Sequence, residues 1–123
     1  MKVRLVGIWD YNSSKDILQW DGNMCRIFGT GDKSAVGDIN MFSVLLHPED
    51  IERITKEVTD TITGVNDFYD AFYTVIKPGG GEAYVHAWGS VFDHNGDVCL
   101  IGACEDVTER KELIESLEKI KNA

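Results

Sequence analysis

The sequence lacks the features that mark disulfide-rich, zinc-binding and membrane-spanning proteins. Its three cysteines, Cys25, Cys99 and Cys104, form no Cys-x-x-Cys pair, which argues against a disulfide framework and against a cysteine-based zinc site. The longest apolar run, at 41–46, is far shorter than the roughly 20 residues of a membrane-spanning helix. No signal-peptide pattern opens the chain. We therefore expect a cytoplasmic protein with reduced thiols.

Positive charge is also scarce. The chain has 12 Lys and Arg residues against 21 Asp and Glu residues, for a formal net charge of −9. An acidic surface repels phosphate backbones and anionic lipids. The sequence therefore predicts no binding to nucleic acid and no contact with a membrane.

Short β-prone segments alternate with helical patterns along the chain. With 43% hydrophobic residues and two prolines in 123 residues, the chain fits one globular domain. The order of segments predicts an α+β fold, a five-stranded antiparallel sheet with helices packed on one face and a half-open interior between them. The expected strands are 3–11, 17–20, 68–76, 83–92 and 98–104; the expected helices are 21–30, 47–62 and 109 onward, and 31–40 is an expected loop.

Several motifs occur in the order in which one protein family has them. Residues 106–111 have the sequence Asp-Val-Thr-Glu-Arg-Lys, and Gly-Ile-Trp at 7–9, Ile-Phe-Gly at 27–29 and His-Pro-Glu-Asp at 47–50 precede it. A glycine hairpin around Gly80 and Gly102 complete the set. The chain resembles the PAS family over nearly its whole length. The resemblance implies a sensory domain at 1–108 and the start of a C-terminal coiled-coil helix at 109–123.

Two departures from the family limit what the resemblance implies about cofactors. The strand after the long helix has Tyr73, Thr74 and Val75 where many relatives carry an arginine. The cysteine segment of the flavin-binding relatives is absent, and Cys25 only echoes it. His47 suits the start of a helix without iron. We therefore expect neither flavin nor haem and no metal site, and the ligand stays unknown.

Strand periodicity and the resemblance together indicate which side chains face the interior. Alternation places Leu100 and Cys104 on one face of 98–104, and by resemblance Cys104 holds the position of a flavin-contacting side chain in light-sensing relatives. In 83–92 we expect the small side chains, Val85 among them, to face inward. A register shift of one residue would bring in His86 and Trp88 instead. The expected pocket residues are Trp9, Tyr11, Phe28, Ile54, Val58, Phe72, Val85, Leu100 and Cys104.

Two further groups of residues are candidates for dimerisation and for signal relay. Large side chains on the other face of 83–92 need a covering helix or a second subunit, and apolar residues recur at helical spacing after Glu109. The expected dimer face is Tyr84, Trp88, Phe92, Leu113, Leu117 and Ile120. By resemblance, Asp106, Thr108 and Arg110 transmit the signal, and helix capping explains Asp106 and Thr108 equally well.

The resemblance implies a sensory module without an active site of its own. We expect a homodimer that binds a small ligand or partner and relays the signal through its C-terminal helix to an effector domain, a histidine kinase in the first place. A PAS module of a diguanylate cyclase and a ligand-free dimerisation module are the alternatives. No spacing of Ser, His, Asp and Glu marks a catalytic constellation. For an enzyme in the same frame, Cys104 is the candidate to test, although core filling explains it more simply.

Overall fold

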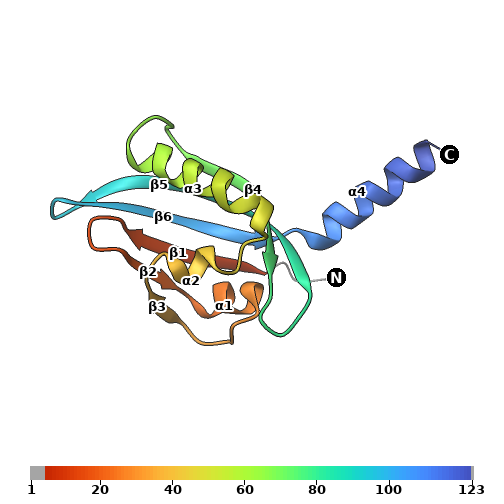
Figure 1. Cartoon of the computed structure of the whole chain (residues 1–123), viewed down its shortest axis with the longest axis horizontal. Helices are drawn as coiled ribbons and strands as arrows, with labels where there is room; N and C mark the ends of the chain where they lie inside the picture. Colours follow the sequence, from red (N-terminus) through yellow and green to blue (C-terminus); the bar gives the residue numbers. More distant parts are fainter. Residues whose placement is uncertain (1–4, 123) are drawn as a thin grey trace.

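The computed structural model describes residues 5–122, which form one antiparallel sheet with helices on one face and a final helix that leaves the sheet (Figure 1). The strand order is β3-β2-β1-β6-β5-β4. The strands are β1 (Val6–Asn12), β2 (Ile17–Trp20), β3 (Ala35–Gly37), β4 (Tyr69–Ile76), β5 (Glu82–His94) and β6 (Asp97–Asp106). The helices are α1 (Gly22–Phe28), α2 (Asn40–Ser43), α3 (Pro48–Ile62) and α4 (Thr108–Lys121). The expected α+β architecture is confirmed.

The hairpin of β1 and β2 supplies two tryptophans to the core. Trp9 lies opposite Trp20 in this pair, and both side chains are buried. The connecting turn contains Asp16 at a positive φ of 54°, a conformation that Asp tolerates better than most residues. Directly after β2, the Asp21 carboxylate accepts a hydrogen bond from the Met24 N–H at 2.8 Å and so caps α1.

The long helix α3 begins at the motif that the sequence singled out. Pro48 occupies its first turn, where a missing N–H costs no hydrogen bond. The N–H of Glu49 donates to Nδ1 of His47 at 3.1 Å, so this histidine caps the helix. Ile54 is completely buried and packs α3 onto the sheet.

The same helix closes the free edge of β4. The Asp50 carboxylate accepts the N–H of Thr74 at 2.9 Å, and the Arg53 guanidinium donates to the carbonyl of Phe72 at 2.8 Å. An unpaired strand edge is a template for pairing with another chain. Side chains of α3 therefore satisfy backbone groups of β4 that would otherwise be available to a partner strand.

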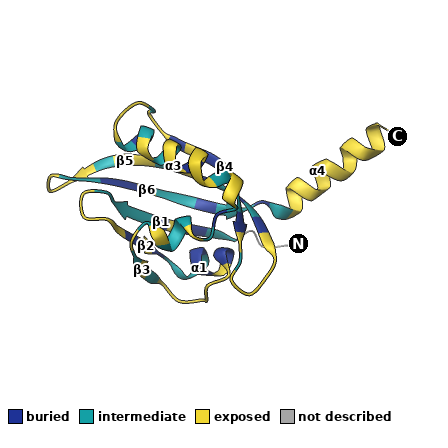
Figure 2. Ribbon diagram, viewed as in Figure 1, coloured by how far each residue is buried: buried dark blue, intermediate teal, exposed yellow. Residues whose placement is uncertain are grey.

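The strands β4, β5 and β6 form the other half of the sheet, and their inner side chains are small. Ala83, Val85 and Ala87 of β5 are buried, while Tyr84 and His86 between them are half-buried. The small residues of β5 thus face the helices. Figure 2 shows the buried residues in the sheet and the inner helices, whereas α4 is exposed along its length.

Two elements lie in or beside a stretch that we expected to be loop. β3 pairs with β2, with Val36 opposite Gln19, and gives the sheet a sixth strand. This edge strand is only three residues long and Val36 is exposed, so the segment lacks the apolar alternation from which strands are predicted. The short helix α2 follows it. The expected start of the first strand at Val3 lies outside the described residues. No helix between residues 5 and 122 is long and apolar enough to cross a membrane.

Candidate functional site

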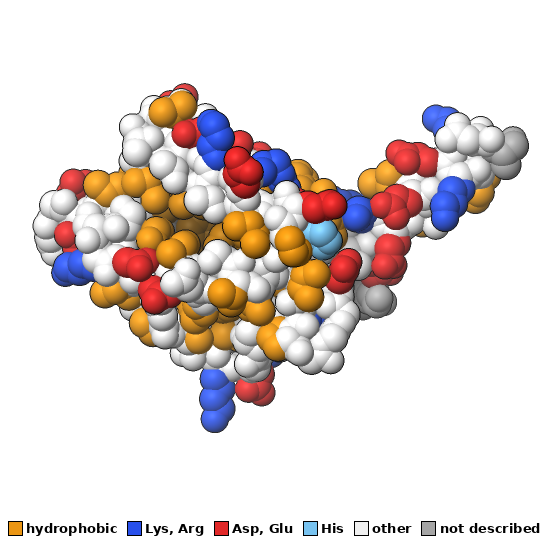
Figure 3. Space-filling view, viewed as in Figure 1, with side chains coloured by type: hydrophobic (Ala, Val, Ile, Leu, Met, Phe, Trp, Pro, Cys, Tyr) orange, Lys and Arg blue, Asp and Glu red, His pale blue; other side chains and the backbone are white. Residues whose placement is uncertain are grey.

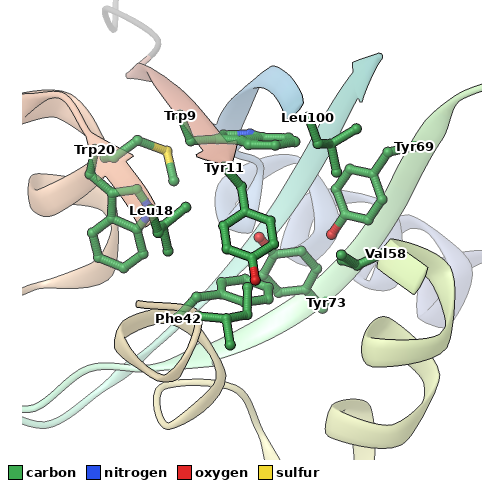
Figure 4. Close-up of a pocket in the computed structure, with 11 residues that line it drawn as sticks. Trp9, Tyr11, Leu18, Trp20, Phe42, Val58, Tyr69, Tyr73 and Leu100 are labelled. Carbon is green, nitrogen blue, oxygen red and sulfur yellow. The ribbon is translucent and has the colours of Figure 1, made fainter. Parts of the chain in front are cut away.

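A small cavity lies between the sheet and the helices α1, α2 and α3. Its volume is about 30 Å³, which is room for roughly two water molecules. Figure 3 shows a hollow surrounded by apolar side chains on this face of the molecule. The residues that line it, drawn as sticks in Figure 4, are Trp9, Tyr11, Leu18, Trp20, Met24, Ile39, Phe42, Val58, Tyr69, Tyr73 and Leu100.

The inner wall of the cavity is the indole of Trp9. A Cβ atom on Gly102 would lie 2.5 Å from this indole, and one on Gly89 would lie 2.8 Å from it. The two glycines, on neighbouring strands, therefore allow the ring to approach the sheet closely. The indole N–H donates to the carbonyl of Ala103 at 3.0 Å. Trp9 is thus fixed to the backbone of β6 by packing and by a hydrogen bond.

A chain of aromatic contacts joins the helices to the far side of the cavity. Ring centroids lie 4.6 Å apart for Trp20 and Phe28, 6.2 Å for Phe28 and Phe42, and 5.5 Å for Phe42 and Tyr73. Such separations are typical of favourable aromatic pairs. Through these contacts α1 and α2 are packed against β2 and β4.

The mouth of the cavity is held by a polar contact. The hydroxyl of Tyr11 donates to Oδ1 of Asp16 at 2.8 Å, and the N–H of Ile39 donates to the same oxygen at 3.1 Å. Burial and the neighbouring carboxylate raise the pKa of Tyr11 to about 12. Through Asp16, the turn between β1 and β2 therefore links Tyr11 of β1 to Ile39, which lies just before α2.

The buried polar groups in the cavity wall and behind it are uncharged at neutral pH. Burial raises the pKa of Tyr69 and of Tyr73 far above the usual range. Burial also raises the pKa of the Cys104 thiol to about 12, and a hydrogen bond with Tyr73 acts in the opposite direction. A nucleophilic cysteine requires a lowered pKa, so the environment of Cys104 is the reverse of a catalytic one.

The expected pocket residues fall into three groups. Trp9, Tyr11, Val58 and Leu100 line the cavity. Others are buried elsewhere in the core, outside this lining, and these are Phe28, Ile54, Val85 and Cys104. The prediction for Phe72 was wrong, because this side chain is 40% exposed on the outer face of the sheet.

The reason for the error at Phe72 is the alternation of β4. Tyr69, Ala71, Tyr73 and Val75 are buried, so the residues between them face outward. The same alternation, visible in the sequence, would have selected Tyr69 and Tyr73 as cavity residues. The other lining residues that we did not predict are Leu18, Trp20, Met24, Ile39 and Phe42.

The outer face of the sheet carries an aromatic cluster. Phe72 stacks on His86 with ring centroids 4.2 Å apart, and on Tyr84 at 6.0 Å. Trp88 continues the row at 4.8 Å from His86. Nε2 of His86 lies 2.6 Å from Oδ1 of Asp70. The expected dimer-face residues Tyr84 and Trp88 belong to this cluster, and Phe92 lies further along β5.

The junction between β6 and α4 is tied to β5. Asp106 Oδ1 accepts hydrogen bonds from the N–H of Thr108 at 3.0 Å and from its hydroxyl at 2.5 Å. The same hydroxyl accepts the N–H of Tyr84 at 2.8 Å, and the N–H of Val107 donates to the Tyr84 carbonyl at 2.8 Å. Asp106 and Thr108 thus lie at the point where α4 meets the sheet.

Beyond this junction α4 extends away from the sheet (Figure 1). The Lys111 ammonium lies 4.4 Å above the ring centroid of Tyr84. An open groove of about 510 Å³ separates the helix from the outer face, and Arg110 lines it together with Phe72 and Ile114. The expected seam residues Leu113, Leu117 and Ile120 are 55–72% exposed.

The three histidines lie outside the cavity lining. His47 caps α3, His86 is on the outer face of the sheet, and His94 is exposed at the end of β5. Within residues 5–122, no group of three His, Cys, Asp or Glu side chains is placed to hold a metal ion.

The fold and the cavity define a class of protein, namely small α+β domains with an apolar cavity between an antiparallel sheet and the helices that cover it. A family model described as PAS fold matches residues 17–104. The chain therefore belongs to the PAS family. No curated protein sequence matches it at a significant level.

Several solved structures share the fold. One is a sensory box histidine kinase/response regulator from Burkholderia thailandensis, with a TM-score of 0.76, 20% identity, and coverage of 95% of this chain and 88% of that chain. Another is the N-terminal domain of a diguanylate cyclase with PAS/PAC sensor from Marinobacter aquaeolei. Its TM-score is 0.72 at 19% identity, and the match covers 86% of this chain and 98% of that chain. A third is the PAS domain of a protein from Colwellia psychrerythraea. Its TM-score is 0.67 at 17% identity, and the match covers 85% of this chain and 88% of that chain.

Proposed function

We propose that this PAS domain senses a small molecule in its apolar cavity and relays the signal through α4 to an effector domain. The observation that carries the proposal is the double attachment of the α4 start to Tyr84, through the Thr108 hydroxyl and the Val107 N–H. Any shift of β5 against β6 changes both hydrogen bonds. The first turn of α4 would therefore respond to a change in the sheet.

The strand β6 supplies a continuous path from the cavity to this junction. Leu100 lines the cavity, and the Ala103 carbonyl binds the Trp9 indole. Asp106, three residues further along the same strand, contacts Thr108. A ligand that moves Trp9 would therefore act on β6 close to the junction. The free energy for the change would come from a higher affinity of the ligand for one packing of α4 than for the other.

We further propose that two copies associate through α4. A helix of 14 residues is marginally stable without tertiary contacts, and its apolar residues lie at coiled-coil spacing. A coiled coil has discrete packings, so a small movement at its first turn can favour one of them. In this proposal, residues 1–108 form the sensory unit and residues 109–123 begin the helix that transmits the signal.

The effector domain that we propose first is a histidine kinase, with a diguanylate cyclase as the second candidate. Structural neighbours include a sensory box histidine kinase/response regulator and a diguanylate cyclase with PAS/PAC sensor. The Asp-Val-Thr-Glu-Arg-Lys sequence at 106–111 supports the same assignment by its resemblance to the family motif.

Native mass spectrometry with an absorption spectrum of the gently purified protein tests for a retained ligand. Hydrogen exchange of the amides in α4, measured with and without that ligand, tests the relay. We expect the ligand to change exchange in the first turn of α4. The variant Thr108→Val should abolish this change, whereas Thr63→Val, at the end of α3, should preserve it. A ligand effect restricted to the cavity would contradict the relay.

A ligand-free dimerisation module is the second candidate, and the cavity volume of about 30 Å³ favours it. Recognised ligand pockets are roughly ten times larger or more. In that case the protein would be purified without any bound molecule, and α4 would pair in the same way under all conditions. Hydrogen exchange of the α4 amides would then depend on protein concentration and would not depend on any ligand.

A further inference from the structure

Tyr11 is a wall of the cavity that lies at its mouth, beside the solvent. Seven of the 11 lining residues are buried, whereas Tyr11, Ile39, Phe42 and Val58 are half-buried at the mouth. Figure 4 shows the Tyr11 ring in the middle of the lining, between the side chains of β2 on one side and Tyr69 and Leu100 on the other. Its neighbours in the sheet are Leu18 and Leu100.

The hydrogen bond that holds Tyr11 in place is open to solvent. Its hydroxyl donates to Asp16 at 2.8 Å, and Asp16 is an exposed residue of a turn. A hydrogen bond between exposed groups is readily exchanged for bonds to water. Rotation of the ring toward solvent therefore costs little in hydrogen bonding, and it leaves a slot that has the shape of a phenol ring.

The slot would have an apolar body and one polar end. Its walls are aromatic and aliphatic, and within the described residues every side chain that lines the cavity is uncharged. At the mouth, Oδ1 of Asp16 would lose its bond from Tyr11 while it keeps the one from the Ile39 N–H. The slot therefore offers a single strong acceptor to a ligand.

We propose that the cavity binds a neutral, phenol-sized aromatic molecule, which displaces the Tyr11 ring and donates a hydrogen bond to Asp16. This inference rests on the proposed sensory function and specifies its ligand class. A cavity of roughly 150 Å³ with apolar walls accommodates benzene, and displacement of a phenol ring adds space of that kind. An anionic ring compound is excluded in either orientation. Its charge would be buried among uncharged side chains, or it would lie at the mouth beside the Asp16 carboxylate.

Titration of the whole chain with p-cresol, toluene and benzoate, followed by amide and indole NMR signals, tests the proposal. We expect p-cresol to shift the Trp9 indole and Ile39 amide signals in a saturable manner. Toluene, which lacks the donor, should bind about fivefold more weakly. Benzoate should cause no saturable shift. Binding of benzoate as tight as that of p-cresol, or shifts confined to the outer face of the sheet, would overturn the proposal.

Two variants assign the effect to Asp16 and Tyr11. Asp16→Gly keeps the positive φ of the turn and removes the carboxylate, so p-cresol and toluene should bind equally well. The control Asn95→Gly, at a turn residue with φ 53°, should keep the fivefold preference. Tyr11→Phe should bind p-cresol more tightly than the native protein, because nothing then competes for Asp16. An unchanged preference in Asp16→Gly would overturn the assignment.

The proposed ligand class and the proposed sensory function can be disproved separately. If a retained molecule changes exchange in α4 but p-cresol does not bind, the ligand class is wrong and the relay stands. If p-cresol binds with the expected preference and exchange in α4 is unchanged, the ligand class stands and the relay is wrong.

Discussion

The two glycines beneath Trp9 set the position of the innermost wall of the cavity. We predict that Gly102→Ala lowers the free energy of unfolding by about 2–3 kcal/mol, because the added methyl would overlap with the indole and with the backbone of β5. Urea denaturation measures the loss. Gly79→Ala is the matched control, since its Cβ would meet no atom within 4 Å, and it should change stability by less than about 0.5 kcal/mol.

Cys104 makes stability depend on pH in the alkaline range. The pKa of its thiol is raised from 9.0 to about 12, so its contribution is complete below pH 9 and is lost as the pH rises toward 12. Over that interval the free energy of unfolding should fall by up to about 1.4 kcal/mol per pH unit. Tyr11, with its pKa raised to about 12, adds to the fall above pH 10.

Urea midpoints measured from pH 7 to 11 check this dependence. The variant Cys104→Ala should lose part of the alkaline slope while it follows the native protein at a constant difference below pH 9. Equal slopes for the two proteins above pH 9 would show that the thiol does not titrate in this way.

Family resemblance and local periodicity each predicted some of the cavity residues, and Trp9 and Tyr11 came from the resemblance. Alternation correctly placed Leu100 in the lining and the small residues of β5 toward the helices. Phe72 was chosen without use of the alternation of its own strand, and it lies on the outer face. Ile39 and Phe42 could not be predicted from the sequence. A loop and a helix of four residues have no periodicity from which an inward face follows.

At the scale of elements, the edge of β4 is covered by two side chains of α3 and by the backbone of Leu45 and His47. We predict that Asp50→Ala lowers the free energy of unfolding by about 1–2 kcal/mol, because the Thr74 N–H loses its acceptor. The freed edge should also increase association at high protein concentration. Glu52→Ala, an exposed position of the same helix, is the control. If light scattering and stability are the same for both variants, Asp50 does not protect the edge.

Most elements were predictable because each has a signal within its own sequence. The Pro48 start of α3 and the Gly29 end of α1 are examples, with Gly29 at a φ of 75°. β3 was missed because its three residues depend on pairing with β2 and on no pattern of their own. The cavity, in turn, arises where four strands of the sheet meet the helices α1, α2 and α3, and such a meeting is set by tertiary packing.

At the scale of the whole molecule, the apolar residues of α4 are the exposed surface that a partner helix could cover. Leu113, Leu117 and Ile120 are exposed in the single chain, and pairing of two α4 helices would bury them. We predict that the protein is a dimer by sedimentation velocity. Leu117→Ala should weaken the dimer by about 3 kcal/mol, which is roughly 100-fold in Kd.

The control and the alternative dimer face are tested in the same experiment. Lys119 lies on another side of α4 than Leu113, Leu117 and Ile120. The control variant Lys119→Ala should therefore leave the Kd of the dimer unchanged. Trp88→Ala removes the largest side chain of the aromatic cluster on the outer face. If Trp88→Ala dissociates the dimer and Leu117→Ala does not, the sheet face is the interface. The free α4 helices would then lie apart, so a signal that reaches Thr108 would have to act on the effector by reorienting single helices, without any change in a coiled coil.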